Sequence, residues 1–202
     1  MKPIAGATLL LSIFVAFPLQ AATIDRTYSY FTIGGVTLDE IEGELRRRGP
    51  KMASTGSSHP GLTRMQFTTK VTYATQGRRC SVTAATVTVK ADVILPRWRK
   101  PRAADADTRF IWGTLSSDIK RHEDTHVRIA RTSALELERE LRQIRNHFGC
   151  DAAKARVEAI TSDVLEKHDR DQASFDRVEG ATFEKRLLRL MESRLDRIEQ
   201  GR

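Results

Sequence analysis

Two histidines one helical turn apart, with a glutamate directly after the first, form the feature of this sequence best suited to chemistry. They lie in the segment His122–Glu123–Asp124–Thr125–His126, which has the HExxH spacing of zinc metalloproteases. Side chains four residues apart on an α-helix project from the same side, so both imidazoles can bind one metal ion. Glu123 lies about 100° round the helix from His122, beside that ion. The sequence therefore predicts a Zn²⁺ site with His122 and His126 as ligands and Glu123 as the general base that accepts a proton from zinc-activated water.

The identity of the third zinc ligand stays open at this level. A longer metalloprotease pattern, which continues with Gly and then His, is excluded because Ile129 and Thr132 occupy those positions. His168 and Glu179 lie on one face of a later helix, but about 16 Å apart along its axis, so only one of them can reach the ion. His59 and His147 are expected at the surface. The candidate donors to the oxyanion are Tyr28, Tyr30 and Tyr73. The candidate hydrogen-bond partners of a ligand histidine are Asp151, Asp169 and Asp176.

The pattern around the motif is helical. Apolar residues step by three or four from about residue 106, which predicts a long helix that carries the motif and ends at Gly149. Both histidines fall on the apolar face of this helix, so they are expected to point toward other elements. A second long helix is predicted from about Asp151, with an interruption near Gly180.

Upstream of these helices the pattern is that of strands. The predicted elements are, in order, a strand over 27–33, a helix from a capping box at Thr37–Glu40 to Gly49–Pro50, a loop over 50–64, and strands over 65–74 and 80–95. The last two strands are expected to pair antiparallel around a turn at Gln76–Gly77, with Pro96 ending the sheet. The predicted fold class is α+β: a small antiparallel sheet packed against two or three long helices, in a single domain over 23–202 that is strand-rich over 23–96 and helical over 104–202.

The N-terminus has the layout of a secretory signal peptide. A basic start at Lys2 is followed by an apolar run over 5–17, a proline and two alanines, and the run is too short to cross a bilayer. We expect residues 1–22 to be removed and the mature chain to be periplasmic or secreted, the alternative being an uncleaved anchor. In such an oxidising compartment Cys80 and Cys150 are expected to form a disulfide rather than remain free thiols.

The charge balance is basic. Lys and Arg number 34 against 26 Asp and Glu, a formal net charge of +8. This predicts a basic surface without identifying a partner. The basic stretch over 97–102 is interpreted as a solvated connector with Trp98 in the core, in preference to a grip on an anionic polymer. Export argues against nucleic acid as a partner.

Beyond these patterns, the chain resembles a family of bacterial secreted proteins assigned, by prediction, as zinc-dependent proteases with a domain of unknown function. The likeness rests on the signal peptide, the Val/Thr-rich strands, the segment Leu95–Trp98 and the HEDTH motif, and it covers residues 28–182. Family members carry His-Gly-Ala-Thr late in the chain, where this sequence has Glu179 before Gly-Ala-Thr, so the resemblance favours Glu179 over His168 as third ligand. The Phe175–Asp176 pair matches a Tyr-Asp pair of the family, but it lies two residues nearer to the Gly-Ala-Thr segment than the family pair does.

The predicted function is therefore a secreted zinc-dependent metallohydrolase, with peptides or proteins as the favoured substrates. One alternative is a peptidoglycan amidase or endopeptidase that uses the same site on a cell-wall peptide. The other is a non-catalytic envelope protein that only binds zinc. No stable membrane insertion is expected after signal cleavage, and the sequence predicts no oligomeric state.

Overall fold

The structure of the chain, a computed structural model, describes residues 22–51, 56 and 58–201. The predicted signal peptide thus lies outside the described residues except for Ala22. The described elements, in chain order, are β1 (Thr23–Ile33), α1 (Leu38–Arg48), β2 (Leu62–Gln76), β3 (Arg79–Trp98), α2 (Ala106–Arg142), β4 (His147–Phe148), α3 (Cys150–Ala181) and α4 (Phe183–Glu199). The α+β fold class is confirmed.

The sheet is mixed rather than antiparallel. Its strand order is β1-β3-β2, with the short β4 paired to the start of β3. β2 and β3 form the predicted antiparallel hairpin, from Leu62 opposite Ile94 to Gln76 opposite Arg79. β1, however, runs parallel to β3, so the prediction of an all-antiparallel sheet is wrong. A parallel pair needs a long crossover between its strands, and α1 together with β2 provides it.

The ends of β3 and of α2 also differ from the predicted ones, and both differences follow from strand pairing. β3 continues past Pro96 to Trp98, because β2 pairs only as far as Ile94 and proline is tolerated beside an unpaired edge. α2 ends at Arg142 rather than at Gly149. The chain leaves the helix early because the carbonyl of Ile144 accepts a hydrogen bond from the backbone of Val82 at 2.9 Å, which brings β4 onto the edge of β3.

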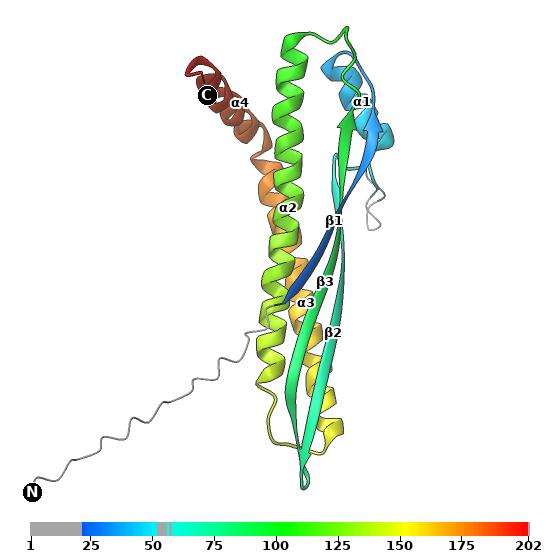
Figure 1. The fold of residues 1–202 in the computed structure, drawn as a ribbon, viewed down its shortest axis with the longest axis vertical. Coiled ribbons are helices and arrows are strands. Elements are labelled where there is room, and N and C mark those ends of the chain that lie inside the picture. Colours follow the sequence, from blue (N-terminus) through cyan, green and yellow to red (C-terminus); the bar gives the residue numbers. More distant parts are fainter. Residues whose placement is uncertain (1–21, 52–55, 57, 202) are drawn as a thin grey trace, which may run out of the picture.

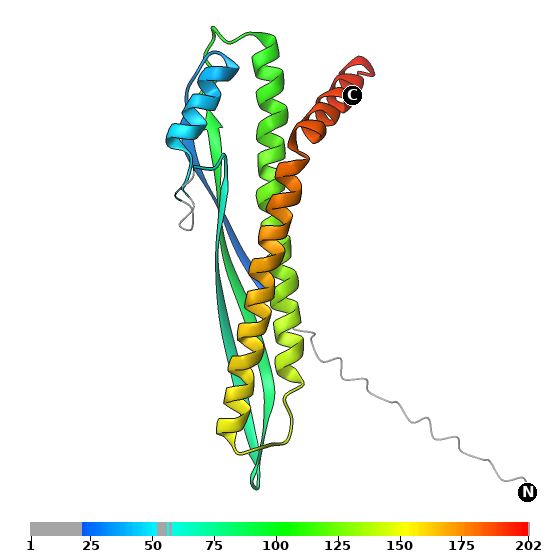
Figure 2. The ribbon, with the colours of Figure 1, turned by 180° about the vertical axis from the view of Figure 1, so that it is seen from behind.

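The helices lie along the sheet as a second layer. α2 is 37 residues long, about 55 Å, and it runs antiparallel to α3 beside the long hairpin (Figures 1 and 2). Alternate residues of β3 such as Val87 and Val89 are fully buried against α2 residues such as Ala134 and Leu137. α4 turns away from this layer after the predicted break near Gly180.

α1 sits at the other end of the sheet from the hairpin turn. The predicted capping box is present: Thr37 Oγ1 accepts from the backbone of Glu40, and Glu40 accepts from the backbone of Thr37. Ile41 of α1 packs with Trp98 and Trp112 in a separate apolar cluster. The prediction that Trp98 belongs to the core is confirmed, since its side chain is buried and its Nε1 donates to the carbonyl of Gly35 at 3.0 Å.

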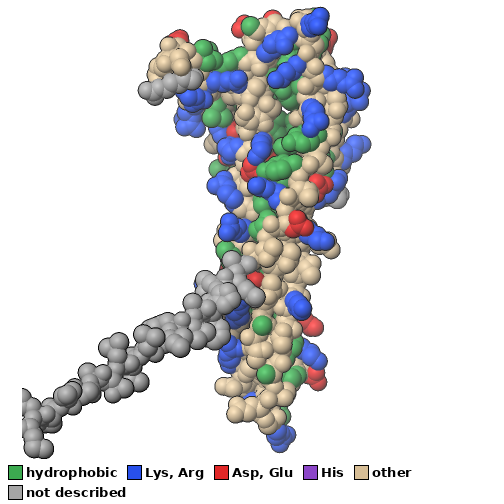
Figure 3. All heavy atoms as spheres, viewed as in Figure 1, with side chains coloured by type: hydrophobic (Ala, Val, Ile, Leu, Met, Phe, Trp, Pro, Cys, Tyr) green, Lys and Arg blue, Asp and Glu red, His purple; other side chains and the backbone are tan. Residues whose placement is uncertain are grey.

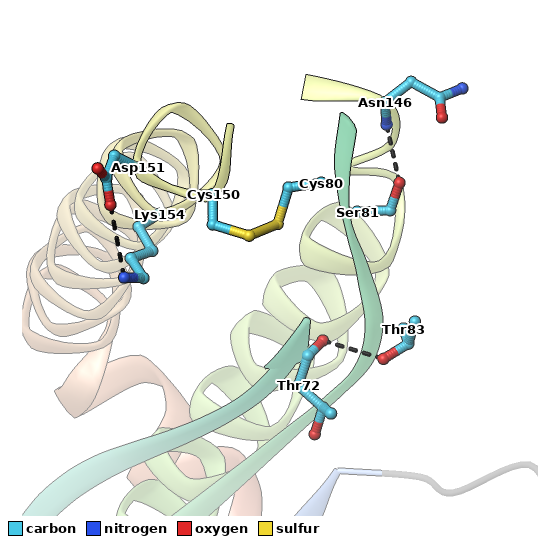
Figure 4. Close-up of a disulfide and its surroundings, with 8 residues drawn as sticks. All are labelled: Thr72, Cys80, Ser81, Thr83, Asn146, Cys150, Asp151 and Lys154. Atoms are coloured by element: carbon cyan, nitrogen blue, oxygen red, sulfur yellow. Dashed lines mark hydrogen bonds and ion pairs between the residues drawn. A yellow bond between two sulfur atoms is a disulfide. The ribbon is translucent and has the colours of Figure 1, made fainter. Parts of the chain in front are cut away.

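The predicted disulfide is present. Cys80 of β3 and Cys150 at the start of α3 are bonded to each other, and Figure 4 shows that the bond ties the N-terminal end of α3 to the sheet. Next to it, Ser81 Oγ accepts a hydrogen bond from the backbone of Asn146 at 2.9 Å. The bridge therefore fixes the end of α3 that lies farthest from α4.

Removing this bridge is expected to destabilise the chain markedly. The cysteines are 70 residues apart in sequence, and opening a loop of that length costs about 4 kcal/mol through the entropy of the unfolded chain. We expect the double variant Cys80→Ser/Cys150→Ser to lose about that much free energy of unfolding in urea titrations under non-reducing conditions. The wild-type chain treated with reductant should show a similar loss, and a change below about 1 kcal/mol in both would contradict the prediction.

The surface of the described residues is polar and largely basic. Lys and Arg side chains are spread along the face seen in Figure 3 rather than gathered in one stripe. Within residues 22–51, 56 and 58–201, none of the helices has the length and apolar character required to cross a bilayer.

Candidate metal centre

The two motif histidines meet one carboxylate of the neighbouring helix. His122 and His126 lie in the middle of α2, and Asp176 lies in α3. Asp176 Oδ1 is 3.2 Å from His122 Nε2 and 3.0 Å from His126 Nε2, and the two Nε2 atoms are 3.1 Å apart. Among the described residues, these three are the group of His, Cys, Asp and Glu side chains whose donor atoms converge closely enough to hold a metal ion.

The dimensions of this triangle fit a zinc ion. With zinc–ligand bonds of about 2.0–2.1 Å in tetrahedral geometry, neighbouring ligand atoms lie about 3.3 Å apart, close to the three separations found here. Asp176 Oδ1 is also buried without a well-formed hydrogen bond among the described residues. A buried carboxylate oxygen in that position needs a partner, and a cation bound at the centre of the triangle would provide one.

The surroundings of His126 leave its Nε2 free to bind a metal. Its Nδ1 is hydrogen-bonded to Gln172 Oε1, and Gln172 Nε2 donates to the carbonyl of His126 at 3.1 Å. A proton held on Nδ1 leaves the lone pair of Nε2 for a ligand, as is usual for zinc-bound histidines. Phe175 lies against both imidazoles, with ring centroids 4.8 Å from His122 and 5.1 Å from His126. The face of α3 that contacts the two motif histidines is therefore formed by Gln172, Phe175 and Asp176.

Glu179, predicted as third ligand, lies beside His122 and outside this triangle. Its Oε2 is 3.6 Å from His122 Nδ1, on the side of the ring opposite the triangle. The same carboxylate is ion-paired with Arg121 and with Arg186, the latter at 3.4 Å. Both arginines also contact the buried carboxylate of Asp118. Glu179 thus belongs to a charged network that joins α2 to the junction of α3 and α4.

His168, the alternative third ligand, lies in α3 one helical turn before Gln172. Its Nδ1 is 3.3 Å from Ser133 Oγ, and its ring packs edge-on against Phe67 at a centroid distance of 5.0 Å. Burial lowers its pKa, which is the behaviour of a neutral imidazole in the core. The structure thus brings His122, His126 and Asp176 together and places both His168 and Glu179 outside that group.

Glu123 lies beside the triangle in a protected position. Its side chain is buried, and its Oε2 accepts a hydrogen bond from Thr63 Oγ1 of β2 at 2.7 Å. Burial raises the pKa of Glu123 above its usual value of 4.5, although the Thr63 hydrogen bond and the two histidines oppose the shift. A carboxylate with a raised pKa is a better base at neutral pH. A Cβ on Gly61 would lie 2.8 Å from Glu123 Oε1, so glycine lets the chain pass close to this carboxylate.

A cavity of about 220 Å³ opens on these groups. Its lining includes His122, Glu123, Asp176 and Glu179, together with the apolar side chains of Pro60 and Phe183. His59, expected at the surface, also lines this cavity. No pattern in the sequence indicated it, and the same holds for Thr63 and Gln172, which contact Glu123 and His126. Asp176 did have a signal, because it is the acid of the Phe175–Asp176 pair and had been a candidate partner of a histidine.

The remaining candidates lie away from this cavity. Tyr28 donates to Asp124 at 2.7 Å on another side of α2, Arg97 packs over the ring of Tyr30, and Tyr73 follows the bulge in β2. Asp151 pairs with Lys154 near the disulfide. An oxyanion donor from these tyrosines is therefore not supported by their positions.

Comparison with known proteins places the chain in a family without assigning it an activity. A family model described as "Bacterial protein of unknown function (DUF922)" matches residues 28–184. The match includes β1 from Tyr28 onward, the whole hairpin, α2 and α3, and therefore every residue of the candidate metal centre. No curated protein and no solved structure matches the chain.

Proposed function

Because the chain belongs to this bacterial family of unknown function, we propose its activity from its own residues: it is a zinc-dependent hydrolase that cleaves peptide bonds. The observation that carries the proposal is the convergence of His122 Nε2, His126 Nε2 and Asp176 Oδ1 within 3.2 Å of one another, beside a cavity that His122, Asp176 and Glu123 line. Three protein ligands leave a fourth position open, as in catalytic rather than structural zinc sites.

The proposed roles follow from these positions. His122, His126 and Asp176 would hold the ion, which when bound supplies a polarised substrate carbonyl and a water of lowered pKa. Glu123, kept in place by Thr63, would accept the proton of the attacking water and return it to the leaving nitrogen. Gln172 would orient His126, and Glu179 would hold His122 from behind, each as a partner of a ligand rather than as a ligand.

Export is part of the same proposal. The signal-peptide pattern at the N-terminus and the Cys80–Cys150 bond both suit a protein that works outside the cytoplasm. We therefore propose that the mature chain acts in the periplasm or outside the cell.

The test combines a metal measurement with two substrates. Purified mature chain should contain one zinc per molecule by elemental analysis and should cleave a fluorescent casein, with both properties lost after chelation and regained with zinc. Purified sacculi are assayed in parallel by turbidity, and activity on sacculi alone would make the substrate a cell-wall peptide. Stoichiometric zinc without either activity would favour the non-catalytic envelope protein, and absence of zinc would refute the proposal.

Zinc binding is expected to weaken steeply in mild acid. Burial alone would lower the pKa of His126, but the Asp176 carboxylate and Gln172 outweigh it and raise the pKa above 6.5. Below that pKa the metal-free imidazole carries a proton that zinc must displace. Affinity should therefore fall about tenfold per pH unit there, and the fall should begin at a higher pH than for an ordinary histidine. Competition titrations with a chromophoric chelator from pH 8 to pH 5.5 measure this, circular dichroism checks the fold, and a flat profile would contradict it.

A further inference from the structure

A second and larger cavity adjoins the candidate metal centre. It has a volume of about 410 Å³, within the usual range of ligand sites. Four residues line both cavities, so the two share a wall: His59, Pro60, Ile119 and Phe183. Its floor is α2, and its sides are α1 and the start of α4. Figure 2 shows the upper part of α2 between those two helices. We call this second cavity the apolar groove.

The floor of the apolar groove leads directly to Glu123. Ile111, Leu115 and Ile119 of α2 follow each other at intervals of four residues, and Glu123 is the next residue in that series. Residues at this interval lie above one another on one face of a helix, about 6 Å apart. The apolar floor from Ile111 to Ile119 is thus about 12 Å long and ends one turn from the proposed general base.

The side walls are apolar as well. Leu38 and Ile41 of α1 face Phe183 and Leu187 of α4 across this floor. Leu38 and Phe183 each remain 38% exposed, although both belong to a lined cavity. The charged residues of the lining, Glu42 and Arg46, are ion-paired with each other, so the groove offers no uncompensated charge to a ligand.

We propose that the apolar groove binds the substrate peptide next to its cleaved bond and selects bulky apolar side chains at alternate positions. This inference rests on the proposed function. An extended peptide advances about 3.3 Å per residue and turns every second side chain to the same side. A floor of about 12 Å therefore accommodates three to four residues, two of which direct their side chains into the groove. Hydrophobic contact along the groove would hold the following peptide bond over Glu123 and the metal.

Two tripeptides of identical composition test the alternation. Acetyl-Leu-Ala-Leu-amide can place both leucines in the groove, whereas acetyl-Ala-Leu-Leu-amide can place only one. Binding is measured by the emission of the two tryptophans, since Trp112 lines the groove and Trp98 packs against it. We expect Leu-Ala-Leu to bind at least about tenfold more tightly, the effect of burying one further leucine. Equal dissociation constants, or no change in emission, would overturn the proposal.

Matched variants locate the binding site. Leu187→Ala, which shortens a wall, and Leu38→Ala, which shortens the opposite one, should each weaken Leu-Ala-Leu binding about three- to tenfold. Leu188→Ala is the control, because Leu188 is the next residue of α4, is 57% exposed and lines neither cavity. Leu188→Ala should bind as the wild type does, and equal losses in all three variants would refute the groove as the site.

The two proposals fail in different ways. The titrations are made on the metal-free mature chain and on zinc-loaded Glu123→Gln, so that hydrolysis does not consume the peptide. If the chain binds no zinc but still prefers Leu-Ala-Leu, the peptide-binding groove is supported and the zinc hydrolase is refuted. If the chain binds zinc and cleaves casein but binds both tripeptides equally, the zinc hydrolase is supported and the peptide-binding groove is refuted.

Discussion

Replacing Asp176 by alanine is expected to abolish zinc binding at micromolar concentrations. Asp176 Oδ1 lies 3.0–3.2 Å from both imidazole nitrogens, so its loss removes one of three ligands and the only negative charge among them. Substitutions of residues that merely support zinc ligands cost about 10–100-fold in affinity, and the loss of a ligand should exceed this. Competition with a chromophoric chelator measures the dissociation constant, and elemental analysis measures the zinc that survives gel filtration.

Two further variants distinguish Asp176 from the ligands suggested by the sequence. Glu179→Gln removes the charge behind His122 and should lower zinc affinity by no more than about 10–100-fold. His168→Ala removes a core imidazole that packs on Phe67, so it should lower the free energy of unfolding while the folded protein keeps its zinc. If Glu179→Gln lost zinc as completely as Asp176→Ala, Glu179 would be the ligand and the triangle described above would be incidental.

The sequence predicted the parts of the centre that lie within one turn of one helix. Four-residue spacing fixes the relative direction of His122 and His126 whatever surrounds them, because helical geometry is local. It also sets Glu123 to the side. In the structure the Nε2 atoms of His122 and His126 lie 3.1 Å apart, and His122 and Glu123 line one cavity.

The third acidic group depends on the docking of two helices, which the motif does not specify. Asp176 and Glu179 are three residues apart and share a face of α3. A small change in the rotation or height of α3 relative to α2 would therefore bring Glu179, in place of Asp176, to the two histidines. The structure sets this height through contacts outside the motif, including the Cys80–Cys150 bond at the start of α3 and, beyond the other end of α3, the ion pair between Arg186 of α4 and Asp118 of α2. Such pairs join residues about 70 positions apart, and neither periodicity nor composition indicates them.

In the sheet, too, the pairing of strands adjacent in sequence was predictable, whereas the pairing of distant strands was not. Alternation and turn residues predicted the β2–β3 hairpin, whose strands are adjacent in sequence. The parallel pairing of β1 with β3 was missed because the strand pattern is the same for either direction. Its consequence reaches the candidate metal centre, since β1 places Tyr28 against Asp124 on another side of α2 and leaves β2 to supply Thr63 to Glu123.

Replacing Glu123 by glutamine is expected to remove turnover while leaving zinc in place. Glutamine has nearly the same shape, and its amide oxygen can still accept the hydrogen bond from Thr63 that holds the side chain. It cannot accept a proton, and loss of a positioned general base lowers rates about 10²–10⁴-fold. We expect casein hydrolysis to fall by at least 100-fold at an unchanged zinc content of one per chain.

Asp124→Asn is the matched control, because it makes the same chemical change at the next residue of the motif. Asp124 pairs with Lys120 and accepts from Tyr28 at 2.7 Å, outside the cavity that contains Glu123. Its substitution should leave both zinc content and hydrolysis near the wild-type level. If Glu123→Gln retained full hydrolysis, the general-base role would be refuted. If Asp124→Asn lost as much activity as Glu123→Gln, the loss would reflect the stability of α2, because a charge removed outside the cavity would then have the same effect as one removed within it.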